Sequence, residues 1–250
     1  MKKISKLILI PLIFSFAVNA QEKNLFGNVK SIKFTTYEIV NKFGTISKGK
    51  MKYLFLNKYD ERKNLIERND SFENGVFNSK QTYQYDNKGN EIERCYYNKS
   101  NSLEEKWIDK YNNNGHKVNQ HRYFSDGSLR DKTTYKTDNT GNVVESIAYD
   151  KNGNFLRRKT YKFDKWDNII EENFLEEDGS ISLTDTYKYD INGNSLGYKY
   201  DEKGNLIEHL STDDKYTYKY EFDKQGNVIK QIEFKNTIPQ EIEEREIEYY

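Results

Sequence analysis

A turn signature recurs every 26 residues along this chain, and the repeat constrains the fold more than any other feature. Each copy opens with an aromatic residue or Thr followed by Asp or Asn. The copies on the 26-residue spacing start at Tyr59, Tyr85, Tyr111, Thr137, Phe163 and Tyr189. Further copies start off that spacing, at Tyr149, Tyr200 and Phe222. Self-similarity at a fixed period is typical of repeat architectures. The sequence therefore predicts a repetitive fold and says much less about biochemistry.

Each copy carries the residues of a β-hairpin bend. In the clearest copy, Asp86 can accept hydrogen bonds from backbone N–H groups two residues on, and Gly89 supplies the positive φ of a type I turn with a G1 bulge. Two copies lack this glycine and carry Lys63 or Asp167 instead. Because Lys adopts a left-handed backbone at a cost of about 1 kcal/mol, we expect the first bend to be the least regular.

A second bend signal lies about halfway through the period. It stands at Phe72–Gly75, Phe124–Gly127 and Glu176–Gly179, where Asn-Gly and Asp-Gly are strong hairpin signals. Each period then holds two strands and two turns, at roughly 13 residues per strand and turn. We expect an all-β fold, a repetitive antiparallel β-meander of about 17 strands. Its sheet would be elongated and twisted or curled, built from 26-residue hairpin repeats.

Residues 1–20 have the layout of a secretory signal peptide. Three lysines precede an apolar run, and small residues surround Ala20. Pro11 interrupts the run and counts against the alternative, a retained anchor helix. We expect cleavage before Gln21, one β-repeat domain over 21–250, and an exported protein in the periplasm, outside the cell or on its surface.

Composition excludes several classes of protein. Beyond residue 20 the chain has 37 Lys and Arg against 40 Asp and Glu, so it offers no basic field for nucleic acid. No later apolar run has membrane-spanning length, which predicts no membrane span once the signal is removed. Cys95 is the only cysteine, so no internal disulfide can form, and we interpret it as a half-buried strand residue.

The hydropathy is low, but the aromatic content argues against disorder. A mean hydropathy of −1.03 is typical of disordered chains. With 21 Tyr and 14 Phe, however, the chain has too many rings for a solvated tail. We expect a thin sheet with much of each face wet, whose core is a layer.

The Tyr-Asp-x-x-Gly-Asn-x-aliphatic unit resembles the YD repeat of the RHS family of bacterial surface and secreted proteins. The likeness extends as a pattern over nearly the whole chain after residue 20 and is clearest from Tyr85 to Ile229. The resemblance implies a long antiparallel sheet; the largest members wrap theirs into shells around toxin domains or bind carbohydrate. Here the period is longer than the family's usual one, and Asn replaces the Arg commonly found after the Gly. The chain is also too short to enclose another domain.

The sequence offers little catalytic or metal-binding chemistry. Asp150-x-Asn152-Gly-Asn154 looks faintly like a calcium loop, but its Gly comes fourth and the twelfth residue is Tyr161. His116, His121 and His209 have no metal-ligand spacing. We therefore predict no catalytic residue, no metal, no cofactor and no enzymatic activity.

The tyrosine ladder is the candidate binding site. The predicted binding residues are Tyr187, Tyr189, Tyr198, Tyr200, Tyr216, Tyr218 and Tyr220. Spacing of two places the last three on one strand face, and the others are expected on the neighbouring strands. Such rings could stack on sugars or grip a peptide, or they could be the packing layer of the sheet.

Three functions follow from these features. The first is a non-catalytic binding or interaction scaffold for a glycan, a cell-wall polymer or a protein partner. The second is a structural or assembly module that pairs through its sheet edges. The third is a carbohydrate-active hydrolase.

Overall fold

The computed structural model confirms an all-β chain of 17 antiparallel strands in one sheet. It describes residues 25–72, 75–189, 198–202, 205–210 and 214–250. The expected signal peptide and parts of three expected bends lie outside these ranges. No helix occurs in the ranges described. The strands are β1 Val29–Lys42, β2 Thr45–Tyr59, β3 Leu65–Phe72, β4 Phe77–Tyr85, β5 Glu91–Tyr97, β6 Leu103–Tyr111, β7 Lys117–Phe124, β8 Leu129–Thr137, β9 Val143–Asp150, β10 Phe155–Phe163, β11 Ile169–Leu175, β12 Ile181–Thr186, β13 Tyr198–Tyr200, β14 Leu206–Leu210, β15 Lys215–Phe222, β16 Val228–Lys235 and β17 Ile238–Tyr249.

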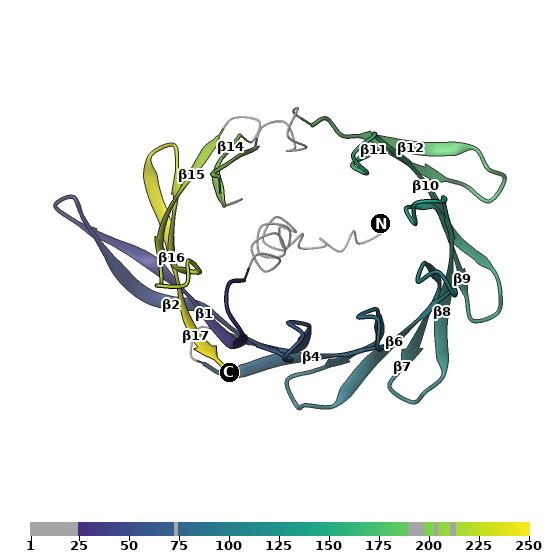
Figure 1. Cartoon of the computed structure of the whole chain (residues 1–250), viewed down its shortest axis with the longest axis horizontal. Coiled ribbons are helices and arrows are strands. Elements are labelled where there is room, and N and C mark those ends of the chain that lie inside the picture. Colours follow the sequence, from purple (N-terminus) through teal and green to yellow (C-terminus); the bar gives the residue numbers. More distant parts are fainter. Residues whose placement is uncertain (1–24, 73–74, 190–197, 203–204, 211–213) are drawn as a thin grey trace, which may run out of the picture.

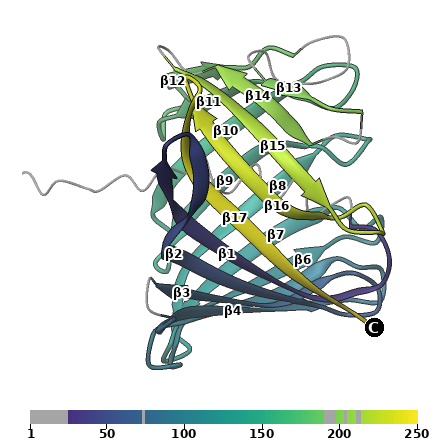
Figure 2. The same cartoon turned by 90° about the vertical axis from the view of Figure 1, so that its left-hand side faces the viewer.

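The meander curls until its first strand meets its last. Consecutive strands pair from β1 to β12 and from β13 to β17, and β1 pairs with β17 from Val29↔Tyr249 to Glu38↔Glu241. The result is a ring of strands that cross the ring axis obliquely (Figures 1 and 2). The sheet is not closed, because no register joins β12 to β13 among the described residues.

The predicted bends that the structure describes adopt the expected type I turn with a G1 bulge, which is a three-residue loop. The N–H of Asp86 donates to the carbonyl of Asn90 at 2.9 Å, and the N–H of Gly89 donates to the carbonyl of Asp86 at 3.1 Å. One carboxylate oxygen of Asp86 accepts from the N–H groups of Lys88 and Asn90, at 2.8 and 2.9 Å. The side-chain amide of Asn90 donates to the other carboxylate oxygen. The Asp and Asn of the motif are therefore the two ends of one internally bonded turn.

The bends form two interleaved series, each with a 26-residue period. One series begins at Asp60, Asp86, Asn112, Asp138 and Asp164, and the other at Phe72, Asn98, Phe124, Asp150 and Glu176. The copy at Tyr149, off the first spacing, thus belongs to the second series. Sequence analysis missed the bend at Asn98, where Asn101 takes the positive φ of 57° instead of a glycine. In Figure 1 one series of bends curls into the ring and the other flares outward.

The expectation that the first bend would be irregular is wrong. Lys63 takes a φ of 66°, and both backbone hydrogen bonds of the loop measure 2.9 Å, no longer than in the glycine copies of the series, where they measure 2.9–3.3 Å. Asp60 accepts from the N–H groups of Arg62 and Asn64. These bonds hold the lysine in a left-handed conformation that it would otherwise avoid.

The tyrosine of the repeat links successive hairpins. A register shift follows each bend of the first series, as between Lys58 and Tyr59 where β2 meets β3. The hydroxyl of Tyr85 donates to the carbonyl of Leu65, beside that shift, at 2.8 Å. One period later, Tyr111 donates in the same way to Glu91 at 2.8 Å. A bulge interrupts the ladder of backbone hydrogen bonds, so each hydroxyl supplies a donor where the ladder is weakest.

The compact apolar cluster lies where the ends of the sheet meet. Val29, Ile32, Phe34 and Tyr59 are buried together, with Ile247 of β17 packed against them. This cluster spans β1, β2 and β17. The sequence had suggested a layered core along the sheet, whereas apolar burial is concentrated at this seam.

We expect Tyr111→Phe to lower the free energy of unfolding by about 1–3 kcal/mol, because it leaves the Glu91 carbonyl without its donor. Urea unfolding followed by circular dichroism measures the loss. Tyr149→Phe is the control, because the Tyr149 ring keeps its contact with Lys132, and it should change stability by less than about 0.5 kcal/mol. An equal loss in both variants would contradict the proposed role of the hydroxyl.

Lys63→Gly should stabilise the protein by up to about 1 kcal/mol, because glycine relieves the left-handed strain at this bend. The same unfolding measurement reports the gain. Gly89→Lys provides the reciprocal control and should destabilise the bend at Asp86, where the glycine has a φ of 85°.

Candidate binding site

Cations lie over aromatic rings on neighbouring strands throughout the sheet. The row across β4 to β7 shows the pattern best. The Arg94 guanidinium carbon lies 5.1 Å from the Tyr83 ring centre and 5.6 Å from that of Trp107, and Arg122 lies 5.4 Å from Trp107. These residues face one another directly in the ladder register. Trp107 therefore has an arginine from each neighbouring strand against its ring.

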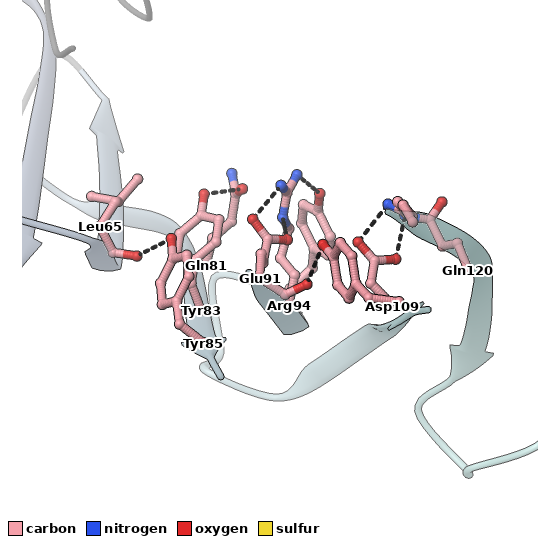
Figure 3. Close-up of polar contacts among 11 residues, drawn as sticks. Leu65, Gln81, Tyr83, Tyr85, Glu91, Arg94, Asp109 and Gln120 are labelled. Carbon is pink, nitrogen blue, oxygen red and sulfur yellow. Dashed lines mark hydrogen bonds and ion pairs between the residues drawn. The ribbon is translucent and has the colours of Figure 1, made fainter. Parts of the chain in front are cut away.

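Acidic side chains neutralise these arginines. Glu91 binds Arg94 through both carboxylate oxygens at 2.9 Å. Asp131 is buried and accepts from Nε of Arg122 at 2.7 Å. In Figure 3, Tyr83, Glu91, Arg94 and Asp109 lie along one such polar row. With its rings and its charges already paired, this row is packing and offers no free stacking platform.

The rows in register with Tyr83 form one face of the sheet, which we call the inner face. It carries most of the buried polar side chains, among them Asn57, Asp131, His209 and Glu241. The opposite face carries exposed cross-strand pairs: Lys58–Glu67, Lys106–Glu93, Lys162–Glu171, Lys199–Glu208 and Lys230–Glu221. Such exposed pairs contribute little to stability.

The inner face carries a stack of three parallel rings on β13, β14 and β15. His209 faces Tyr198 on one side and Tyr216 on the other in the ladder register. The His209 and Tyr216 ring centres are 4.5 Å apart with planes 2° from parallel, and those of His209 and Tyr198 are 5.4 Å apart at 14°. His209 is buried, but Tyr198 at the end of the stack is 36% exposed. The stack thus ends in an accessible ring.

Two further side chains, Tyr218 and Glu233, lie beside the stack on the neighbouring strands. The Tyr218 hydroxyl lies 3.1 Å from Nδ1 of His209, and Glu233 faces Tyr218 on the next strand. Burial lowers the pKa of His209, which favours the uncharged ring. Burial and the nearby Glu241 carboxylate raise the pKa of Glu233. Glu241 faces Glu233 and is bound by Nζ of Lys52 at 2.8 Å.

The structure brings only some of the predicted tyrosines together. Tyr216, Tyr218 and Tyr220 share the inner face of β15, as expected. Tyr198 joins them only through His209, because the neighbours of β15 are β14 and β16. The expectation that the strand of Tyr198 and Tyr200 would adjoin β15 is therefore wrong.

The remaining predicted tyrosines contact other strands. The hydroxyl of Tyr187 donates to Glu172 at 3.1 Å and that of Tyr189 donates to the carbonyl of Ile169 at 2.9 Å, both on β11. Tyr200 pairs with Leu206, whose carbonyl accepts from Tyr220 at 2.5 Å. These contacts serve the sheet and lie apart from the stack.

Sequence analysis missed His209 as a member of the site. Its position follows from the bend at Asp201, which pairs Tyr200 with Leu206 across a register shift and so sets His209 opposite Tyr198. No group of three or more potential metal ligands occurs in the described residues. The same part of the chain has no helix long and apolar enough to cross a membrane.

No family model and no curated protein matches the sequence. The fold is similar to a porin-like protein from Bacteroides uniformis, with a TM-score of 0.42 and 11% identity over 90% of this chain and 98% of that one. It is also similar to part of the Photorhabdus luminescens Tc holotoxin pore, with a TM-score of 0.39 and 15% identity over 85% of this chain and 11% of that one. A third match is TcdB2-TccC3 without its hypervariable C-terminal region, with a TM-score of 0.38 and 10% identity over 80% and 13% of the two chains. Likenesses this remote assign no family and no function.

Glu233→Gln should change how stability depends on pH. A raised folded-state pKa stabilises the protein below the unfolded pKa, and this contribution disappears as the pH rises through the folded pKa. The free energy of unfolding of the variant, relative to that of the native chain, should therefore increase from about pH 4.5 upward. Urea unfolding between pH 4 and 8 measures this difference. A difference that is flat across this range, or that decreases with pH, would contradict the assignment.

Proposed function

We propose that this chain is an exported, non-catalytic binding scaffold, and that it binds a glycan at the ring stack Tyr198–His209–Tyr216. The supporting observation is the stack itself: parallel rings on three strands that end in an exposed tyrosine. Around Trp107, cations from both neighbouring strands occupy the ring faces, whereas in the stack Lys235 lies over the Tyr216 end, 6.0 Å from the ring centre, and Tyr198 is exposed at the other end. A pyranose ring offers a flat C–H face that can continue such a stack, while its hydroxyls reach polar groups at the edge.

Polar groups for such a sugar lie beside the stack. The Tyr218 hydroxyl, Glu233 and Glu241 are on the same inner face, one, two and three strands from His209 on the side away from Tyr198. Sites for small polar ligands combine aromatic walls with a few fixed hydrogen-bonding groups. The extended curved sheet suits a polymer that contacts several strands better than a small enclosed ligand.

The assembly-module hypothesis has less support. It requires free edge strands, but the first and last strands pair with each other over Val29–Glu38 and Glu241–Tyr249. Neither terminal strand is therefore an edge for a second chain over these residues, and an assembly edge would have to come from β12 or β13, which no register joins among the described residues. We also propose that the chain is not a hydrolase, since Lys52 binds Glu241, one of the two facing carboxylates Glu233 and Glu241 on the inner face; release of reducing sugar by the purified protein would overturn this.

We expect Tyr198→Ala to weaken glycan binding by at least about tenfold, because it removes the accessible end of the stack. A glycan array identifies the ligand, and titration calorimetry with that glycan measures the affinity. Unchanged affinity in Tyr198→Ala would contradict the proposed site.

Tyr53→Ala is the matched control. Tyr53 is 43% exposed, close to the value for Tyr198, but it lies on β2 away from the stack. The control should bind normally. Circular dichroism of both variants establishes that the sheet is intact.

A further inference from the structure

The first hairpin departs from the repeat. β1 pairs with β17 only as far as Glu38, and β2 pairs with β3 only from Tyr53 onward, yet β1 and β2 continue to pair as far as Lys42↔Thr45. Residues 39–52 therefore form a two-stranded ribbon with no third strand on either side. β1 and β2 project beyond the wall of the ring at the left of Figure 1. Two-stranded hairpins are at best marginally stable alone, so this extension needs an explanation.

The base of the ribbon is bent and anchored. The β1–β2 register shifts twice, between Thr36 and Tyr37 and between Tyr37 and Ile39. Such bulges bend a strand. Lys48 binds Glu244 at 2.8 Å, and its ammonium lies 5.0 Å from the Tyr37 ring centre. The ribbon is thus held out from the sheet at a fixed base.

The tip of the ribbon breaks the residue preference of its turn. Phe43 and Gly44 have φ values of 53° and 85°, the two positive angles of a type I′ turn, where Asn-Gly is preferred. A second two-residue bend, between β16 and β17, has Asn236 at the corresponding position, with a φ of 48°. Phe43 is 107% exposed, so packing does not compensate for its strain. A local rule broken without a structural gain is typical of a functional residue.

The ribbon is also basic. Residues 39–52 contain Lys42, Lys48, Lys50 and Lys52 and no acidic residue. Lys48 and Lys52 bind glutamates of β17 at the base, and Lys42 is exposed beside Phe43. An exposed ring next to lysines fits a surface that is anionic outside and apolar beneath.

We propose that the ribbon docks the protein on an anionic lipid bilayer, with Phe43 entering the boundary between headgroups and acyl chains. A projecting tip meets a flat bilayer without needing a complementary pocket. Lysines near the surface are attracted to anionic headgroups, and an apolar side chain adds insertion. One ring with Lys42 beside it gives weak, reversible binding, which would leave the ring-stack face free for its own ligand.

The test is sedimentation of the chain from Gln21 onward, which contains all the strands, with two kinds of vesicle. We expect binding to phosphatidylglycerol–phosphatidylcholine vesicles, little binding to pure phosphatidylcholine, and weaker binding as salt screens the lysines. Phe43→Asn should lower the affinity for anionic vesicles by about tenfold or more, since it removes the ring that would enter the bilayer. Phe43→Asn should also melt at a higher temperature, because Asn suits the type I′ turn.

Phe124→Asn is the matched control. Phe124 is another exposed phenylalanine at a bend, 44% exposed, with Arg130 over its ring. The Phe124→Asn variant should bind anionic vesicles as strongly as the native chain does. Equal binding by Phe43→Asn and the native chain, or equal binding to both vesicle types, would overturn the proposal, as would failure of the native chain to bind anionic vesicles.

Discussion

A lysine or arginine lying over an aromatic ring of the neighbouring strand is the interaction on which this sheet depends. A single layer of strands has no second layer to cover its faces, so most of its side chains cannot be buried in an apolar core. Among the described residues, the buried apolar cluster lies at the seam of β1, β2 and β17. Elsewhere, pairs such as Arg94 on Trp107 and Lys159 on Phe174 bury ring surface against a charged but flexible side chain. This explains how a chain with 32% charged residues and a mean hydropathy of −1.03 can form an ordered sheet.

The bends and the tyrosine hydroxyls convert these pairs into a curved repeat. Each Asp–Asn bend is bonded internally and therefore forms the same loop wherever it occurs. The register shift next to each bend of the first series adds local bending and twist to the strand pair. At Tyr85, Tyr111 and Tyr189, the hydroxyl of the repeat donates to the carbonyl beside the preceding shift. Repetition of one small distortion curls the sheet until β1 reaches β17.

Both proposed functional regions lie where the repeat is broken. At β13 to β15 a histidine replaces the cation between two rings, and the stack runs from Tyr216, under Lys235, to the exposed Tyr198. At β1 and β2 the hairpin outgrows its neighbours and places a phenylalanine where the turn prefers asparagine. In the regular repeats, side chains of neighbouring strands pair with one another. We therefore expect ligands to bind where this pairing is interrupted.

The sequence by itself determined the strand class, the approximate strand number and most of the bends, because Asp, Gly and Asn act within a few residues of one another. It also placed Tyr216, Tyr218 and Tyr220 on one strand face, through the two-residue alternation of a β-strand. Only the tertiary structure decided that β17 pairs with β1, that His209 joins Tyr198 to Tyr216, and that cations cover the ring faces around Trp107. These contacts depend on cross-strand register, which accumulates over many bends and register shifts. A shift of one residue moves a side chain to the opposite face, so no local motif could fix them.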